Sequence, residues 1–202
     1  MENAVVEKLV VFVCTGNTCR SPMAEAIFRY EAKRRGLPII VRSAGIDAVA
    51  KGSMHLHSLR TLANHGLSIE NFTPTPLSEG LMRDATAIVC MTEPQKELAA
   101  YHCSRLLGVE GAQKVYAFSD FCGYSIPDPY GQPIEAYENT YQALEGGMSA
   151  LIDGLFPKKS SPKPKKRTAK KPEAVEKTEK TATKKKTTGA RKGRPKKEKI
   201  TE

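Results

Sequence analysis

The residues with the clearest chemical potential lie near the N-terminus, where five residues separate Cys14 from Arg20. A turn of this length lets its main-chain N–H groups converge on one anion, and an arginine guanidinium offers two donors to phosphate oxygens. The same groups favour the thiolate of Cys14, which would make its sulfur a nucleophile near neutral pH. The alternative is an inert buried thiol, which is common for a free cysteine. The spacing favours a phosphate-binding loop with a nucleophile at its base.

The segments on either side of this turn are suited to hold it. Residues 8–13 form a β-branched run, Lys-Leu-Val-Val-Phe-Val, which predicts a strand buried on both faces. Ser21 and Pro22 follow the turn and are typical of a helix cap and a first helical position. We therefore expect a helix over residues 22–35, whose positive N-terminal end would add to the anion site.

Asp128 is the candidate proton donor. A leaving group in phosphoryl transfer needs a proton, and an acid on a loop at the carboxyl end of a parallel sheet is well placed to supply it. Pro127 and Pro129 flank this residue and stiffen its loop. The alternative interpretation is a turn aspartate beside proline, which is the commoner meaning of Asp-Pro in isolation.

The remaining chain to residue 156 alternates short apolar segments with amphipathic ones. Strands are expected at 38–42, 85–91 and 114–118, and helices at 56–66, 94–107 and 133–156. This alternation predicts an α/β domain over residues 1–156, with a parallel sheet and helices on both faces.

Residues 157–202 have a different composition. They hold 19 Lys and Arg against 5 Asp and Glu, a net charge of +14, whereas residues 1–156 hold 13 against 17, a net of −4. Large apolar side chains are almost absent, so we expect this tail to be disordered. A charge of +14 attracts nucleic acid, which makes DNA a candidate partner, although a tail that only aids solubility is an equal alternative.

One short element of the tail resembles an AT-hook, in which Gly-Arg-Pro lies in a narrow A·T minor groove and flanking lysines meet phosphates. The element consists of Lys192, Gly193, Arg194, Pro195, Lys196 and Lys197. If it binds DNA, association with the nucleoid would follow.

Several classes of protein and site are disfavoured by the sequence. The longest apolar run, Leu9 to Cys14, is six residues, far below the ~20 that cross a bilayer, so no membrane span is expected. The N-terminus lacks the features of a secretory signal, which favours the cytoplasm. Five cysteines without a C-x-x-C pair fit neither a disulfide framework nor a structural zinc site.

No cofactor or metal is expected either. The histidines lack metal-ligand spacing; they are His55, His57, His65 and His102. Three further cysteines are interpreted as packing residues, namely Cys90, Cys103 and Cys122.

The turn and its flanks resemble the signature of the low molecular weight cysteine phosphatases, Cys-x-Gly-Asn-x-Cys-Arg-Ser-Pro. In this chain it reads Cys14-Thr15-Gly16-Asn17-Thr18-Cys19-Arg20-Ser21-Pro22. The likeness continues through Met23-Ala24-Glu25, Ser43-Ala44-Gly45 and Asp128-Pro129-Tyr130. It implies a four-stranded parallel sheet of flavodoxin-like character and a phosphorylated protein as substrate. Hydrolysis would pass through a phosphocysteine on Cys14, with Arg20 binding the phosphoryl oxygens.

The resemblance also implies roles for the other loop residues. Ser21 would donate a hydrogen bond to the thiolate, and Asn17, with Ser43, would hold the loop in shape. Cys19 would form a disulfide with Cys14 under oxidation, or else be a small buried side chain. The expected phosphate-binding loop comprises Thr15, Gly16, Asn17, Thr18, Cys19 and Ser21.

Two positions depart from the family pattern. Many members have a histidine that braces the loop asparagine, and the nearest matching position here is Phe72. Tyrosine phosphatases of animal type often carry a second aromatic after the position of Tyr130, where this chain has Gly131. The second change weakens the wall expected around a phosphotyrosine ring and leaves Tyr130 as the aromatic specificity candidate.

Thr18 is the second specificity candidate. A branched aliphatic side chain there would face an aromatic ring, whereas a hydroxyl offers a polar contact to a guanidinium-type leaving group. The loop resembles the bacterial protein arginine phosphatase branch of the family, so phosphoarginine is favoured over phosphotyrosine. Arsenate reductase is a weaker alternative, because its chemistry needs two closely spaced redox cysteines and Cys90 and Cys103 are thirteen apart. A DNA-associated protein, anchored by its folded part, is the alternative from another class.

Overall fold

The sheet is the framework on which the rest of the fold is built. A computed structural model of the chain describes residues 8–157. Four strands pair in the order β2-β1-β3-β4, and every pairing is parallel. Their bounds are β1 Lys8–Cys14, β2 Ile39–Gly45, β3 Ala87–Cys90 and β4 Val115–Ala117. The predicted parallel α/β sheet is confirmed.

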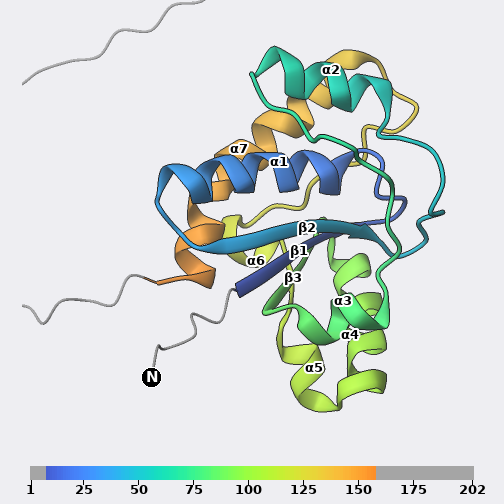
Figure 1. The fold of residues 1–202 in the computed structure, drawn as a ribbon, viewed down its shortest axis with the longest axis vertical. Helices are drawn as coiled ribbons and strands as arrows, with labels where there is room; N and C mark the ends of the chain where they lie inside the picture. The colour runs from blue at the N-terminus through green and yellow to red at the C-terminus, as the bar shows by residue number, and fades with distance from the viewer. Residues whose placement is uncertain (1–7, 158–202) are drawn as a thin grey trace, which may run out of the picture. The chain divides into compact units, whose positions relative to one another are not determined.

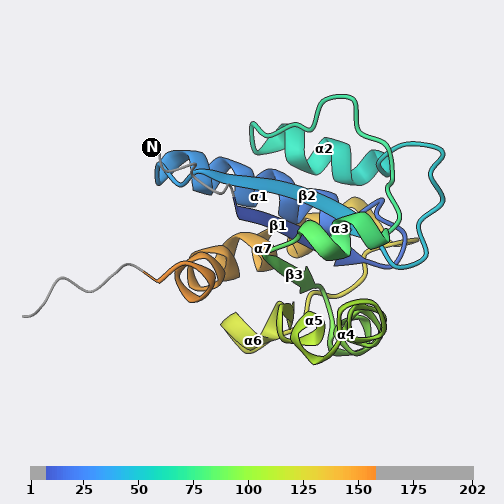
Figure 2. The ribbon, with the colours of Figure 1, turned by 60° about the horizontal axis from the view of Figure 1, so that its bottom comes forward.

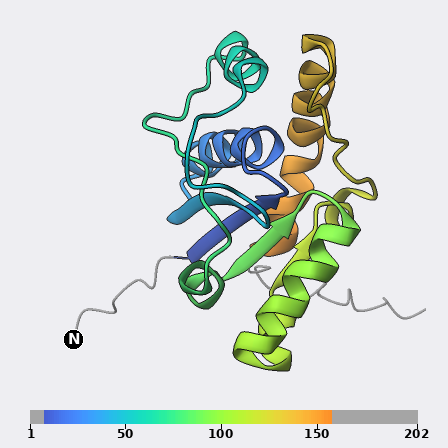
Figure 3. The ribbon, with the colours of Figure 1, turned by 90° about the vertical axis from the view of Figure 1, so that its right-hand side faces the viewer.

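Seven helices accompany the sheet in the described part of the chain. They are α1 Arg20–Arg34, α2 Leu56–Asn64, α3 Glu79–Asp84, α4 Glu93–Leu107, α5 Val109–Gln113, α6 Ser119–Cys122 and α7 Ile134–Leu155. Figures 1 and 3 show α1 and α2 on one side of the sheet and α3, α4 and α5 on the other. In Figure 2, α4 and α5 lie beneath β3, on the side away from α2. Both faces of the sheet are therefore covered, as the sequence predicts.

The central strand β1 divides the core into two clusters. Phe12 belongs to the cluster that also contains Phe28 of α1 and Leu144 of α7. Val11 and Val13, on the opposite face, belong to the cluster formed with α4. Because alternate side chains of a strand point to opposite faces, a strand that serves two cores must be apolar at every position.

Three short helices were not predicted from the sequence. α3, α5 and α6 have six, five and four residues, which is too short for a helical period to emerge from the apolar pattern. Three cysteines were predicted to be packing residues. Cys90 and Cys103 are fully buried in one core cluster, and Cys122 is half-buried.

The prediction that Ser21 caps the first helix is wrong. The helix begins at Arg20, its N-cap residue is Cys19, and no side chain caps it. The Ser21 hydroxyl instead contacts Cys14 and Ala44.

None of the helices in residues 8–157 combines the length and apolarity needed to cross a membrane. The predicted disorder and AT-hook of the tail lie outside the described residues, apart from Pro157.

Candidate active site

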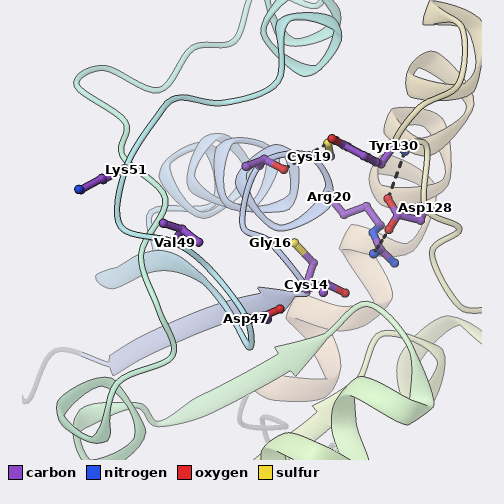
Figure 4. A pocket seen from close by; sticks show the side chains of 11 residues that line it. Cys14, Gly16, Cys19, Arg20, Asp47, Val49, Lys51, Asp128 and Tyr130 are labelled. Carbon is purple, nitrogen blue, oxygen red and sulfur yellow. Dashed lines mark hydrogen bonds and ion pairs between the residues drawn. The ribbon is translucent and has the colours of Figure 1, made fainter.

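The turn between β1 and α1 lies at the carboxyl end of the sheet. Cys14 is the last residue of β1 and Arg20 is the first of α1. In a parallel sheet all strands end on this edge, so the segments that follow β2 and β4 reach the same place. Figure 4 shows Cys14, Arg20 and Asp128 close together there, although Asp128 is 108 residues from Arg20 in the chain.

The sulfur of Cys14 is buried and touches the start of α1. Its Sγ lies 3.0 Å from Ser21 Oγ, in agreement with the contact that the family resemblance implies. The Ser21 hydroxyl also donates to the Ala44 carbonyl oxygen over 3.2 Å. A residue predicted as a helix cap thus connects the nucleophile candidate with the end of β2.

Asn17 holds the centre of the turn. It is fully buried and has a φ of 53°, in the left-handed region that asparagine tolerates better than most residues. Its Nδ2 donates to Ser21 Oγ over 2.9 Å, and its Oδ1 accepts the main-chain N–H of Thr75 over 2.8 Å. A backbone amide therefore provides the brace that the family often takes from a histidine, while Phe72 packs against the core.

The expectation that the Ser43 side chain supports the turn is wrong. Its hydroxyl donates to Glu25 Oε2 over 2.6 Å, and that carboxylate also pairs with Arg29. The turn instead rests on the main chain of Gly45, where an added Cβ would lie 2.5 Å from the Thr15 carbonyl oxygen. Only glycine allows β2 to approach the turn this closely.

The Arg20 guanidinium is held at two nitrogens and free at the third. Its NH2 lies 2.5 Å from Asp128 Oδ2, and its NH1 donates to the Ile126 carbonyl over 3.3 Å. Its Nε is buried and has no partner among the described residues. Burial forces such a donor to find an acceptor, and a bound oxyanion would supply one.

The main-chain donors of the turn are also free. Within residues 8–157, the N–H groups of positions 15–19 donate to no protein acceptor. Together with Arg20 Nε they form a set of unpaired donors around the Cys14 sulfur, which suits a tetrahedral oxyanion. No group of three or more His, Cys, Asp or Glu that could hold a metal ion is found in the same part of the chain.

A pocket of about 370 Å³ opens above these groups. It is lined by Cys14, Thr15, Gly16, Thr18, Cys19, Arg20, Asp47, Val49, Lys51, Asp128 and Tyr130. The structure thus brings eight predicted site residues into one pocket, with Asn17 and Ser21 buried behind it. Three lining residues were missed, namely Asp47, Val49 and Lys51. The signal that could have found them is their position just after Ser43-Ala44-Gly45, at the carboxyl end of β2.

Comparisons with known proteins agree with this geometry. Residues 9–161 match the family described as low molecular weight phosphotyrosine protein phosphatase. The chain belongs to this family.

Relatives in the family carry two kinds of name. The protein-arginine-phosphatase of Bacillus subtilis is 37% identical over 139 residues, which cover 67% of this chain and 89% of the relative. The probable low molecular weight protein-tyrosine-phosphatase EpsP of Ralstonia solanacearum is 31% identical over 72% of this chain and 94% of its own length. This chain is accordingly a protein phosphatase, and its relatives differ in the phosphorylated residue that they are named for.

Solved structures give the same assignment. A mutant of YwlE from Bacillus subtilis aligns with a TM-score of 0.68 and 35% identity, covering 74% of this chain and 99% of that one. The tyrosine phosphatase Wzb from Escherichia coli K30, in complex with sulphate, aligns with a TM-score of 0.64 and 26% identity. The alignment covers 74% of this chain and 99% of that one. The low molecular weight phosphatase fold is therefore shown for the described residues.

An aromatic wall, absent from the sequence prediction, backs one side of this phosphatase pocket. The His55 ring lies 5.8 Å from the Tyr130 ring and stacks on Tyr137 at 5.0 Å. The His55 main-chain N–H donates to the Thr18 carbonyl over 2.9 Å, so the wall is joined to the turn. Burial and the neighbouring His57 lower the pKa of His55, which favours its neutral form.

Cys19 lies between the turn and this wall. Its Sγ is 3.6 Å from Thr18 Oγ1 and 3.9 Å from the Tyr137 hydroxyl. Burial raises the pKa of the Cys19 thiol, against weaker opposition from its hydrogen bonds to Thr18 and Tyr137. Both Cys14 and Cys19 are free thiols in the structure, so their disulfide remains a prediction.

Proposed function

We propose that this phosphatase hydrolyses phosphoarginine residues of proteins through a phosphocysteine on Cys14. The observation that carries the chemistry is the set of unpaired donors around the Cys14 sulfur, completed by the buried Nε of Arg20. Asp128, at the mouth of the same pocket, is the proposed acid and base. The proposed roles are supported by the meeting of these residues in one pocket at the carboxyl edge of the sheet.

In the first step, the Cys14 thiolate forms an S–P bond while the P–N bond to the guanidino group breaks. The electron pair of the P–N bond stays on nitrogen, which takes the proton of the Asp128 carboxyl group and leaves as unmodified arginine. Arg20 and the N–H groups of the turn stabilise the charge on the phosphoryl oxygens in the transition state.

In the second step, water attacks phosphorus and the S–P bond breaks. The Asp128 carboxylate, left by the first step, accepts a proton from that water. Inorganic phosphate leaves, the Cys14 thiolate is restored, and the protonated Asp128 is ready for another turnover. Ser21, 3.0 Å from the sulfur, is placed to donate to the restored thiolate.

The choice of phosphoarginine is supported by Thr18, which lines the pocket. Its hydroxyl can bond to a guanidinium N–H, a contact that an aromatic ring does not need. The relative with 37% identity is named a protein-arginine-phosphatase. The deciding experiment is a comparison of kcat/KM on matched phosphoarginine and phosphotyrosine peptides, with a higher value expected for phosphoarginine.

Phosphotyrosine is the second candidate substrate because of Tyr130. This ring lines the pocket, and the residue is 69% exposed, so its ring offers a face to another aromatic ring. A higher kcat/KM on the phosphotyrosine peptide would favour this second function and reject the first.

We further propose that the tail binds nucleic acid without contributing to catalysis. Support comes from composition alone, since residues 157–202 carry a net charge of +14 and include Gly193-Arg194-Pro195.

A further inference from the structure

Asp47 lines the pocket but has no part in the steps proposed above. It is the second residue after the end of β2, and its main chain is hydrogen-bonded to the turn. The Asp47 N–H donates to the Thr15 carbonyl over 3.0 Å, and the preceding N–H, of Ile46, donates to the Cys14 carbonyl over 3.0 Å. Because two successive amides hold this segment to the turn, the Asp47 side chain projects from a fixed point beside the nucleophile candidate.

The charge of Asp47 is not balanced by the protein. Within residues 8–157, its carboxylate forms no ion pair and accepts no hydrogen bond, whereas Asp128 is paired with Arg20. Lys51 is the other charged residue of the same segment at the pocket, and Figure 4 shows its ammonium pointing away from Cys14 and Arg20. The pocket wall therefore presents a carboxylate that has no ion-pair or hydrogen-bond partner within residues 8–157.

An uncompensated carboxylate is unfavourable in a site that receives a phosphate dianion, since like charges repel at short range. The cost disappears if the substrate brings its own cation. A phosphoarginine side chain does so, because its guanidinium carries positive charge and several N–H donors beside the phosphoryl group. The phenyl ring of phosphotyrosine has neither.

We infer that Asp47 is a specificity-determining residue that accepts hydrogen bonds from the guanidinium of the substrate. The inference rests on the proposed function and extends it, because it defines the substrate class as a cationic phosphoguanidine. Carboxylate and guanidinium form short, charge-assisted and often bidentate hydrogen bonds, so Asp47 selects by charge and geometry. Thr18 adds a neutral acceptor from the turn.

The test compares Asp47→Asn with the unchanged full chain. This substitution keeps the side-chain shape and removes the charge. We expect kcat/KM on a phosphoarginine peptide to fall by about 5- to 30-fold, mainly through KM, the scale of a partly exposed charge-assisted hydrogen bond. Activity on a matched phosphotyrosine peptide should be unchanged or higher. Asp47→Glu should restore part of the loss, and Glu110→Gln, with the same charge change on the distant α5, should alter neither value.

Two results would overturn the inference. An equal loss on both peptides would mean that Asp47 only supports the turn, and no change on either would mean that it does not contact the substrate. If the unchanged chain fails to hydrolyse phosphoarginine, the proposed function fails by itself. Asp47 is then judged by titrating free phosphoarginine into the Cys14→Ser chain, with and without Asp47→Asn. Weaker binding on loss of the charge supports the inference, and equal affinities reject it.

Discussion

Arg20 and Asp128 form an ion pair in which NH2 of the guanidinium lies 2.5 Å from Oδ2 of the carboxylate. The arginine side chain is 5% exposed and the aspartate side chain 49%, so the pair joins the buried, proposed anion-binding group to a residue at the pocket mouth. A phosphoryl group that binds Arg20 competes with Asp128 for the same cation. Substrate binding would thereby weaken the contact between Arg20 and Asp128, at the step where the proposed acid acts.

Asp128→Asn tests the role of the acid. The rate on a phosphoarginine peptide, which has a poor leaving group, should fall by ~10²- to 10⁴-fold, the usual scale for general acid catalysis. Hydrolysis of an activated aryl phosphate should fall less, because its leaving group needs little protonation. Steady-state kinetics on both substrates measure this difference. Equal losses on the two would contradict a role in protonating the leaving group.

Cys14→Ser separates chemistry from binding. The serine hydroxyl is a much poorer nucleophile than a thiolate, so turnover should disappear. The unpaired donors of the turn and Arg20 remain, so the chain should still bind inorganic phosphate in a calorimetric titration. Retention of full activity would exclude Cys14 as the nucleophile. Loss of phosphate binding together with a normal unfolding curve would mean that the turn is not the anion site.

Thr18→Ile tests the polar contact to the leaving group. Activity on phosphoarginine should fall by about tenfold, the effect of one lost hydrogen bond to a charged group, while activity on phosphotyrosine is spared or rises. Thr18→Ser, which keeps the hydroxyl, is the matched control. If the ratio of the two kcat/KM values does not move, this position does not select the substrate.

Glu25→Gln tests the buried carboxyl group of α1 that accepts from Ser43. Burial raises the pKa of Glu25, although bonds from Ser43 and Arg29 oppose the shift. The folded chain thus binds this proton more tightly than the unfolded chain, so its stability falls as pH rises from the ordinary value of 4.5 through the raised pKa. The side chain of glutamine does not ionise, so the stability of the variant lacks this decrease. Urea unfolding at pH 4.5 and 7.5 should show the variant gaining stability relative to the unchanged chain at the higher pH, and parallel behaviour would refute this assignment.

Removal of residues 157–202 tests the tail. The shortened chain has a net charge of −4 and should keep its activity on a small phosphate ester while losing DNA binding. The full chain should shift DNA in gels with an affinity that falls steeply as salt rises. Arg194→Ala should remove any preference for A·T-rich duplex and leave most sequence-independent binding. Equal affinity of the full chain for A·T-rich and G·C-rich duplexes would reject the AT-hook, and no shift at low salt would reject DNA binding.

Contacts that are local in the chain could be predicted, and contacts between distant segments could not. The buried strand, the five-residue spacing and Arg20 are adjacent in sequence, so the turn and its place in an α/β sheet follow from their order. The Thr75 brace of Asn17 depends on a main-chain amide 58 residues away, and an amide has no signature in a sequence. Asp47 was not predicted either, because only the folded position of the segment after β2 brings it into the pocket.

The stacked His55 and Tyr137 illustrate a second limit. They are 82 residues apart by number, and periodicity predicts Tyr137 only as one apolar position of a helix. Ser21 shows the reverse error, since its type and place match a helix cap, yet its hydroxyl contacts the Cys14 sulfur and the Ala44 carbonyl of β2. A local rule is overridden when a buried polar group elsewhere needs the same side chain.

The Ser21 hydroxyl has one proton and two neighbours that can accept it, the Ala44 carbonyl and an ionised Cys14 sulfur. Asn17 Nδ2 already donates a hydrogen bond to the Ser21 oxygen. The hydroxyl hydrogen can therefore change partner only by rotation about the C–O bond. The O–H bond should point to the carbonyl when the sulfur is neutral and turn to the sulfur when it is charged. Since Ser21 is wholly buried, this proton should exchange slowly with solvent, and its NMR frequency should follow ionisation of the nucleophile as pH is varied.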